Sequence, residues 1–169
     1  MNKDTYVECL VSRKTSGLLN FLRILLIMLA IAFFLLGFIT NIGLIALILG
    51  VLFAVLAYMV YLRSDIEYEY LYLDREITID RISAKSKRKR IASFEVEHME
   101  ILAPIKSYHL DNYKNRTVKT TSDYSSGVEK QPDCRFVMYY EGDQKIILEP
   151  NEDFVKAVSN VAPRKVFKD

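Results

Sequence analysis

The chain has 169 residues, of which 51% are hydrophobic and 26% are charged, and its formal net charge is +2. Residues 1–63 carry five Lys/Arg against two Asp/Glu, whereas residues 64–169 carry eighteen against nineteen. The longer part is therefore not a basic body built for nucleic acid, and its length suffices for one compact domain rather than two.

Residues 1–22 are expected to form a cytoplasmic leader. A secretory signal peptide would end at a small-residue cleavage site, but here the apolar run continues into a second apolar stretch. The spacing of Tyr6, Val7, Leu10 and Val11 suits a short interfacial helix on the membrane surface. A frayed polar tail fits the same residues, so both interpretations stay open.

Residues 24–62 contain no charged side chain and are bounded by Arg23 and Arg63. One helix of this length would far exceed the hydrocarbon core of a bilayer, which is about 30 Å thick. Polar and turn-favouring residues cluster only at 40–43, where Asn and Gly tolerate a tight reversal. The stretch 23–62 therefore predicts a hairpin of two transmembrane helices, at residues 23–39 and 42–62.

Positive charge flanks this hairpin, while its connecting loop has none. Lys14 and Arg23 lie before or at the start of the first span, and Arg63, Arg75 and Arg81 follow the second. Because cytoplasmic span ends carry an excess of Lys and Arg, we expect a multi-pass protein of the cell membrane with both termini in the cytoplasm.

Small residues recur along one face of the second span. They are Gly43, Ala46, Gly50, Ala54 and Ala57. Small side chains let helix backbones approach closely in lipid, and Ala30 and Gly37 offer a matching face on the first span. The two faces either pack together within the hairpin or form a surface for a second copy or a larger membrane partner. Since residues 24–62 include no Asp, Glu, Lys, Arg or His, a transporter or channel by itself is not expected.

Residues 65–169 are expected to form an antiparallel β-barrel or sheet closed by a C-terminal helix. Alternation and apolar clustering predict strands or strand-like segments at residues 65–74, 77–82, 91–96, 134–140 and 145–148, and a strand or helical turn at 99–105. Residues 106–133 predict a long polar excursion or a weak hairpin. Asn151 can cap a helix over about 152–160 that Pro163 ends.

The densest charge run covers residues 84–90, and its cations are Lys85, Lys87, Arg88, Lys89 and Arg90. On a hairpin loop of a membrane-tethered domain, these cations would contact anionic lipid. Each Lys or Arg near such a surface gains about 1 kcal/mol of binding free energy. A solvated turn that keeps strand edges soluble is the main alternative. Nucleic-acid contact is a lesser one, and no nucleic-acid partner is expected.

No catalytic residue, metal or cofactor is predicted. Glu95, Glu97, Glu100 and His98 offer weak metal spacing and fit exposed acids that balance the basic run. The Ser and Cys residues have no His/Asp partner arrangement, and no glycine-rich loop follows a strand, so the protein is not expected to be an enzyme.

Two further residue types have ordinary structural interpretations. Cys9 and Cys134 form neither a disulfide framework nor a metal spacing, so reduced cytosolic thiols are expected. Tyr68, Tyr70 and Tyr72 recur with a period of two, which favours the wall of a β core over a recognition stripe.

Six or so short antiparallel strands and one closing helix resemble the order of a pleckstrin-homology-like (PH-like) barrel. The stretch EYEYLYLDREITIDRISAKSKRKR resembles a family of two-span membrane proteins from Gram-positive bacteria, in which the spans precede a cytoplasmic PH-like domain. This resemblance covers nearly the whole chain. It implies an architecture and a location, but no activity.

We therefore expect a membrane-anchored, non-enzymatic interaction or scaffold module at the cytoplasmic face. Its partners would be the lipid bilayer, another membrane protein or further copies of itself. The alternative is an auxiliary or regulatory subunit of a membrane enzyme or transporter, in which the small-residue face is the working surface.

Overall fold

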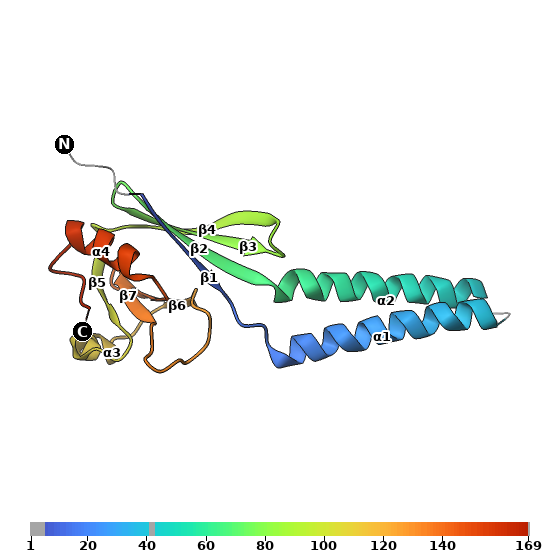
Figure 1. Cartoon of the computed structure of the whole chain (residues 1–169). Helices are drawn as coiled ribbons and strands as arrows, with labels where there is room; N and C mark the ends of the chain where they lie inside the picture. The colour runs from blue at the N-terminus through green and yellow to red at the C-terminus, as the bar shows by residue number, and fades with distance from the viewer. Residues whose placement is uncertain (1–5, 41–42, 169) are drawn as a thin grey trace. The chain divides into compact units, whose positions relative to one another are not determined.

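The computed structural model describes residues 6–40 and 43–168, and Figure 1 shows the order of their elements. These residues fall into two compact units. The helical unit lies within residues 15–66 and 83–86, and the β unit lies within residues 6–14, 67–82 and 87–168.

The helical unit is a hairpin of α1 (Gly17–Ile39) and α2 (Gly43–Ser64). Both helices are long and apolar enough to cross a membrane, and most of their side chains are exposed, as lipid contact requires. The helix α1 begins six residues before the predicted first span, so Arg23 lies inside it. The predicted turn residue Asn41 and the predicted span start Ile42 lie outside the described residues.

Residues before the helices form strand β1 (Val7–Ser12), so both interpretations of this part of the leader, 1–22, were wrong. The strand pairs antiparallel with β2 (Ile66–Leu73), which places Cys9 opposite Tyr70. Buried side chains alternate with exposed ones along β1, which is the period of a half-buried strand rather than of a helix. The β unit therefore contains chain from both sides of the helical hairpin.

The pairing of β1 with β2 allows a soluble form of the β unit. Ser12 lies opposite Glu67, so the chain ends that flank the helices are neighbours. A short Gly/Ser linker in place of residues 16–64 would join them without removing a strand. We call this design the linker variant.

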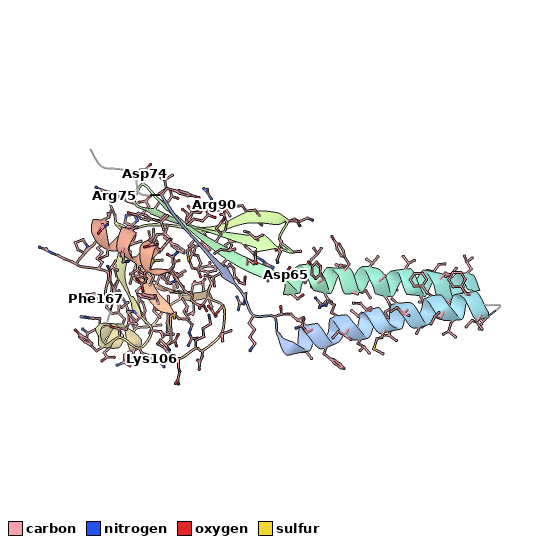
Figure 2. All side chains as sticks on the ribbon, viewed as in Figure 1. Asp65, Asp74, Arg75, Arg90, Lys106 and Phe167 are labelled. Carbon is pink, nitrogen blue, oxygen red and sulfur yellow. The ribbon has the colours of Figure 1, made fainter. Side chains whose placement is uncertain are left out.

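The first sheet has the strand order β1-β2-β3-β4, with β3 at Glu76–Ser83 and β4 at Lys87–Glu95. The two-residue turn between β2 and β3 has positive φ at both Asp74 and Arg75, 49° and 66°. Figure 2 shows both residues at the tip of that hairpin. These angles are those of a type I′ turn, whose twist suits a tight hairpin.

The second sheet has the order β5-β7-β8-β6. Its strands are β5 (Met99–Pro104), β6 (Thr120–Asp123), β7 (Phe136–Tyr140) and β8 (Gln144–Leu148). The pairs β5–β7 and β7–β8 are antiparallel, whereas β6 pairs with β8 in parallel. The strands thus form two sheets rather than one closed barrel, within the predicted class of antiparallel β structure closed by a helix.

The closing helix α4 (Glu152–Val161) begins at its predicted cap. The Asn151 side chain accepts a hydrogen bond from the backbone N–H of Phe154 at 2.8 Å, and two acids occupy the first turn. Phe154 is fully buried, and its ring lies 6.1 Å from that of Tyr70 on β2. The apolar face of α4 therefore closes the core next to the first sheet.

The predicted polar excursion, 106–133, contains more structure than expected. It holds a 3₁₀ turn at Tyr108–Leu110, helix α3 (Asp111–Lys114) and strand β6. Leu110 is buried in a cluster with Ile101 and Tyr139 of the second sheet. A few apolar residues in a polar segment are thus enough to cover one face of that sheet.

An ion pair holds the end of this segment in place. We expect the stability that this ion pair contributes to depend on pH. Asp133 accepts hydrogen bonds from the backbone N and the Nε of Arg135 at 3.1 and 2.9 Å, and its side chain is only 4% exposed. The Arg135 guanidinium lowers the pKa of Asp133 to about 2. The pair therefore stabilises the fold above the unfolded-state pKa of about 3.9, and this contribution is lost as the pH falls through the folded-state pKa.

We expect Asp133→Asn to lower the free energy of unfolding of the linker variant by about 1–2 kcal/mol at neutral pH. The difference from the parent should begin to shrink below about pH 4 and should fall to a few tenths of a kcal/mol near pH 2, where the folded parent takes up the proton. Urea unfolding at neutral pH and at pH 2 measures this. An equal loss at both would show that the amide disturbs packing and that the charge is irrelevant.

Candidate functional site

The basic run lies mostly on a strand, so its predicted place on a hairpin loop was wrong. Only Lys85 is in the β3–β4 turn, where Ala84 and Lys85 have positive φ of 48° and 54°. The other four cations begin strand β4. Within the helical unit, the backbone N of Ala84 donates to the carbonyl O of Asp65 at 2.8 Å, and Asp65 directly follows α2 (Figure 2). The turn is thus bound to the end of the second candidate span.

Two of the five cations are held by buried carboxylates on neighbouring strands. The Nε of Arg88 lies 2.6 Å from Oδ2 of Asp80 on β3, and its Nη2 contacts Oε2 of Glu69 on β2. The Nε of Arg90, labelled on β4 in Figure 2, lies 3.8 Å from Oδ1 of Asp80. Both carboxylate side chains are only 8% exposed, so they depend on these guanidinium groups for a counter-charge.

A third carboxylate, on β1, extends this cluster. Burial and the neighbouring Glu8 raise the pKa of Glu69, whereas hydrogen bonds from Glu69 and Tyr6 lower the pKa of Glu8. The Tyr6 hydroxyl donates to Glu8 at 2.8 Å. The hydrogen bond to Asp80 raises the pKa of Arg88, which stays charged. The cluster is therefore an internal charge network that offsets Arg88 and Arg90.

The remaining cations Lys85, Lys87 and Lys89 are exposed. None of them forms an ion pair with another residue in the described ranges. The five cations of the β3–β4 hairpin thus fall into two groups. Two arginines neutralise buried acids, and three lysines expose their charge to solvent. These three lysines are the residues available to an external anion.

A groove of about 740 Å³ lies in the β unit beside β1. Its walls come from β1, from the segment 126–136 and from the start of α4. The strand β1 is an edge of its sheet, so one side of its backbone is not paired with any strand in the part of the chain that the structure describes. An edge strand beside a partly apolar groove can bind an extended peptide by strand addition.

One carboxylate and one thiol in this groove have shifted pKa values. Burial opposes ionisation of Glu149, but hydrogen bonds from Ser126 and Lys130 outweigh it and hold the pKa of Glu149 below its ordinary value. Burial raises the pKa of the Cys9 thiol, so Cys9 is a protonated and weakly nucleophilic group. Cys9 is therefore not an activated nucleophile.

Four members of the small-residue face of α2 lie against α1. Ala46, Gly50 and Ala57 are buried, and a Cβ on Gly50 would lie 3.3 Å from the ring of Phe34. A Cβ on Gly43 would lie 2.7 Å from the carbonyl O of Gly37. These contacts serve packing within the hairpin. Ala54, the fifth member, is exposed.

The three tyrosines of β2 belong to the core, as predicted. Tyr68, Tyr70 and Tyr72 are 6%, 0% and 3% exposed. The Tyr70 hydroxyl donates to the carbonyl O of Tyr124 at 2.5 Å and accepts from the backbone N of Glu149 at 3.3 Å. Burial raises the pKa of Tyr70 far above its ordinary value. This phenol joins the first sheet to the loops that follow β6 and β8.

None of the three acids near His98 pairs with the basic run among the described residues: Glu95 lies 3.7 Å from Nδ1 of His98 itself, and the other two pair with arginines from other parts of the chain. Glu97 lies 3.2 Å from Arg75, and Glu100 lies 2.6 Å from Arg116. Across the described part of the chain, no group of three or more His, Cys, Asp or Glu side chains is placed to hold a metal ion.

Comparison with known proteins identifies the family. The family model described as Bacterial PH-like domain (DUF6106) matches residues 3–168, which is nearly the whole chain and agrees with the predicted resemblance. No curated protein and no solved structure matches significantly. PH-like domains are generally non-catalytic and typically mediate interactions, and the two apolar helices fit a membrane protein. The chain therefore belongs to the bacterial PH-like domain family DUF6106.

Proposed function

We propose that this protein is a membrane-anchored, non-enzymatic interaction module, in which two transmembrane helices hold a PH-like domain at the cytoplasmic face. The observation that carries this proposal is the pairing of β1 with β2 in one sheet. The two strands lie on either side of α1 and α2 in the sequence. Two membrane crossings return the chain to the side on which it started. The strands β1 and β2 would therefore lie on the same side of the membrane, where they can pair.

The cytoplasmic side is favoured by the charges that flank the helices. Lys14 precedes α1, Arg23 lies in its first two turns, and Arg63 lies in the last turn of α2. Lys and Arg near span ends are retained in the cytoplasm. Thr40, at the opposite end of α1, would then face the outside.

We propose further that the domain contacts the inner leaflet through Lys85, Lys87 and Lys89. The turn that carries Lys85 is hydrogen-bonded to Asp65, at the end of α2 where the membrane surface is expected. Arg88 and Arg90 are not part of the proposed contact, because Asp80 and Glu69 already neutralise them. Anionic headgroups would supply the counter-charge that the three lysines lack.

The groove beside β1 favours a second candidate, an auxiliary subunit that binds a segment of another membrane protein. Leu10 lines this groove and is 54% exposed, which gives an incoming strand an apolar contact. A stoichiometric partner captured from solubilised membranes, and lost when Leu10 is replaced with Lys, would favour this candidate over lipid contact alone.

The native cysteines test the proposed topology. Cys134 is exposed, whereas Cys9 is buried and its pKa is raised, so a maleimide should react at Cys134 alone. In intact cells, a membrane-impermeant maleimide should leave the protein unlabelled. After permeabilisation, labelling should rise at least about tenfold, because the reagent then reaches the exposed Cys134 thiol.

A second thiol reports the opposite side. The substitution Thr40→Cys, made together with Cys134→Ser, should be labelled in intact cells. The extent of its labelling there should equal that of Cys134 in permeabilised cells. If Cys134 instead reacted in intact cells and the thiol introduced at position 40 did not, the cytoplasmic placement of the domain would be wrong. Labelling of both thiols in intact cells would contradict membrane spanning itself.

A further inference from the structure

The two helices enclose an apolar groove of about 520 Å³ on one side of the hairpin. Its walls include Ile27 and Phe34 of α1 and Ala54 and Tyr58 of α2, and Arg23 and Tyr61 lie at one end. Ala54 is the one exposed member of the small-residue face, and it lines this groove together with Ala57 and with Ala30 of α1. The groove is thus an apolar surface groove between the helices, with a cation at one end.

Arg23 has no carboxylate partner among the residues described. Its guanidinium lies over the ring of Tyr61, with 5.9 Å between the Cζ and the ring centroid. The Tyr61 hydroxyl donates to Asp65 at 3.4 Å, so Arg23 contacts the ring of Tyr61 and not its hydroxyl. A cation at the edge of the hydrocarbon layer is costly unless it reaches water or an opposite charge.

We propose that this groove binds one anionic phospholipid, with an acyl chain along the apolar walls and the phosphate on Arg23. The inference goes beyond the surface contact of the three lysines and rests only on the helices lying in the bilayer. A phosphate satisfies Arg23 through charge-assisted hydrogen bonds, and a guanidinium matches a phosphate in two-point geometry. Basic pockets between helices on the cytoplasmic side are suited to such headgroups.

Charge complementarity favours a lipid over a second copy of the chain. Residues 24–62 contain no Asp or Glu, so the spans of a second copy bring no counter-charge to Arg23. A twofold dimer packed across this groove would also place the two Arg23 side chains at the same depth. Such an arrangement adds like-charge repulsion, whereas an anionic headgroup removes the charge.

Native mass spectrometry of the full-length protein, released from nanodiscs of equal phosphatidylglycerol and phosphatidylcholine, tests the proposal. We expect one retained phosphatidylglycerol per chain and little phosphatidylcholine. Arg23→Gln should lower this retention about fivefold, which corresponds to about 1 kcal/mol per charge. Arg63→Gln is the matched control, because Arg63 lies at the same membrane boundary but outside the groove, and it should leave retention unchanged.

A second pair of variants keeps Arg23 and changes the groove. Ala54→Phe fills the groove and should also displace the lipid, whereas Val55→Phe adds the same ring to an exposed position outside it. Equal retention of the two lipids, or equal losses in Arg23→Gln and Arg63→Gln, would overturn the proposal. So would a dimer that Ala54→Phe dissociates. Because every measurement starts from protein inserted in nanodiscs, these results are independent of the cysteine test of orientation.

Discussion

Replacing Lys85, Lys87 and Lys89 with Ser in the linker variant is expected to weaken its binding to anionic vesicles on the order of a hundredfold. Each lysine near an anionic surface contributes about 1 kcal/mol, and these three are exposed and unpaired with any described residue. Because surface attraction is screened by salt, binding of the parent should fall steeply as ionic strength rises. Vesicle sedimentation at a series of salt concentrations measures both effects.

The control removes the same charge from elsewhere on the domain. Lys106, Lys156 and Lys168 are exposed and lie outside the hairpin, so their replacement with Ser should change vesicle binding far less. Arg88→Gln should behave differently again, because it leaves Glu69 without a guanidinium partner and leaves Asp80 with Arg90 alone, and it should lower stability by roughly 2 kcal/mol. If the control triple weakened binding as much as the hairpin triple, the contact would be a general charge effect and not a site.

Tyr70→Ala is expected to lower the free energy of unfolding of the linker variant by about 3–5 kcal/mol. Tyr70 is fully buried, its ring contacts Phe154 of α4, and its hydroxyl bonds to the chain at Tyr124 and Glu149. The substitution removes the ring and also leaves the part-buried backbone N–H of Glu149 without this acceptor. Since a domain of this size is stable by only about 5–15 kcal/mol, much of the variant should be unfolded under mild denaturant.

The phenylalanine variant separates the ring from the hydroxyl. Tyr70→Phe keeps the contact with Phe154 and should cost about 1 kcal/mol, the usual value of a lost hydrogen bond. Urea unfolding of the parent and the two variants gives the three free energies. An unfolding midpoint of Tyr70→Ala equal to that of the parent would show that the sheet–helix core does not depend on this side chain.

Elements with a strong local signal could be predicted from the sequence. Two apolar spans, the alternating strand with its three tyrosines and the capped helix after Asn151 all follow from composition over a few residues. Each signal is local because span length, period and cap chemistry do not depend on distant partners. The class of fold follows from their order.

Strand β1 was missed because its partner is distant in the sequence. Val7, Cys9 and Val11 do alternate with Glu8, Leu10 and Ser12, but the same residues also have helical spacing. Only pairing with β2, whose Tyr70 lies opposite Cys9, decides between the two. Such long-range pairing cannot be deduced from a six-residue window.

The division within the basic run could not be predicted for a similar reason. A run of four cations resembles a solvated turn until Asp80 and Glu69, from two other strands, are placed against Arg88. That placement depends on the register of the sheet, which a single sequence does not specify. Buried acids within apolar strands are the signal that points to such pairing.

If α1 and α2 cross the membrane as proposed, the pairing of β1 with β2 makes formation of the first sheet depend on the insertion of both helices. During synthesis, the edge strand leaves the ribosome before either helix and must wait for the whole hairpin before its partner appears. A chain that inserted only one helix would leave the two strands in different compartments, where the first sheet cannot form. Such a chain would expose the apolar residues of β2 to proteases and chaperones. With the proposed topology, insertion of both helices and completion of the first sheet would therefore be a single event in the maturation of this protein.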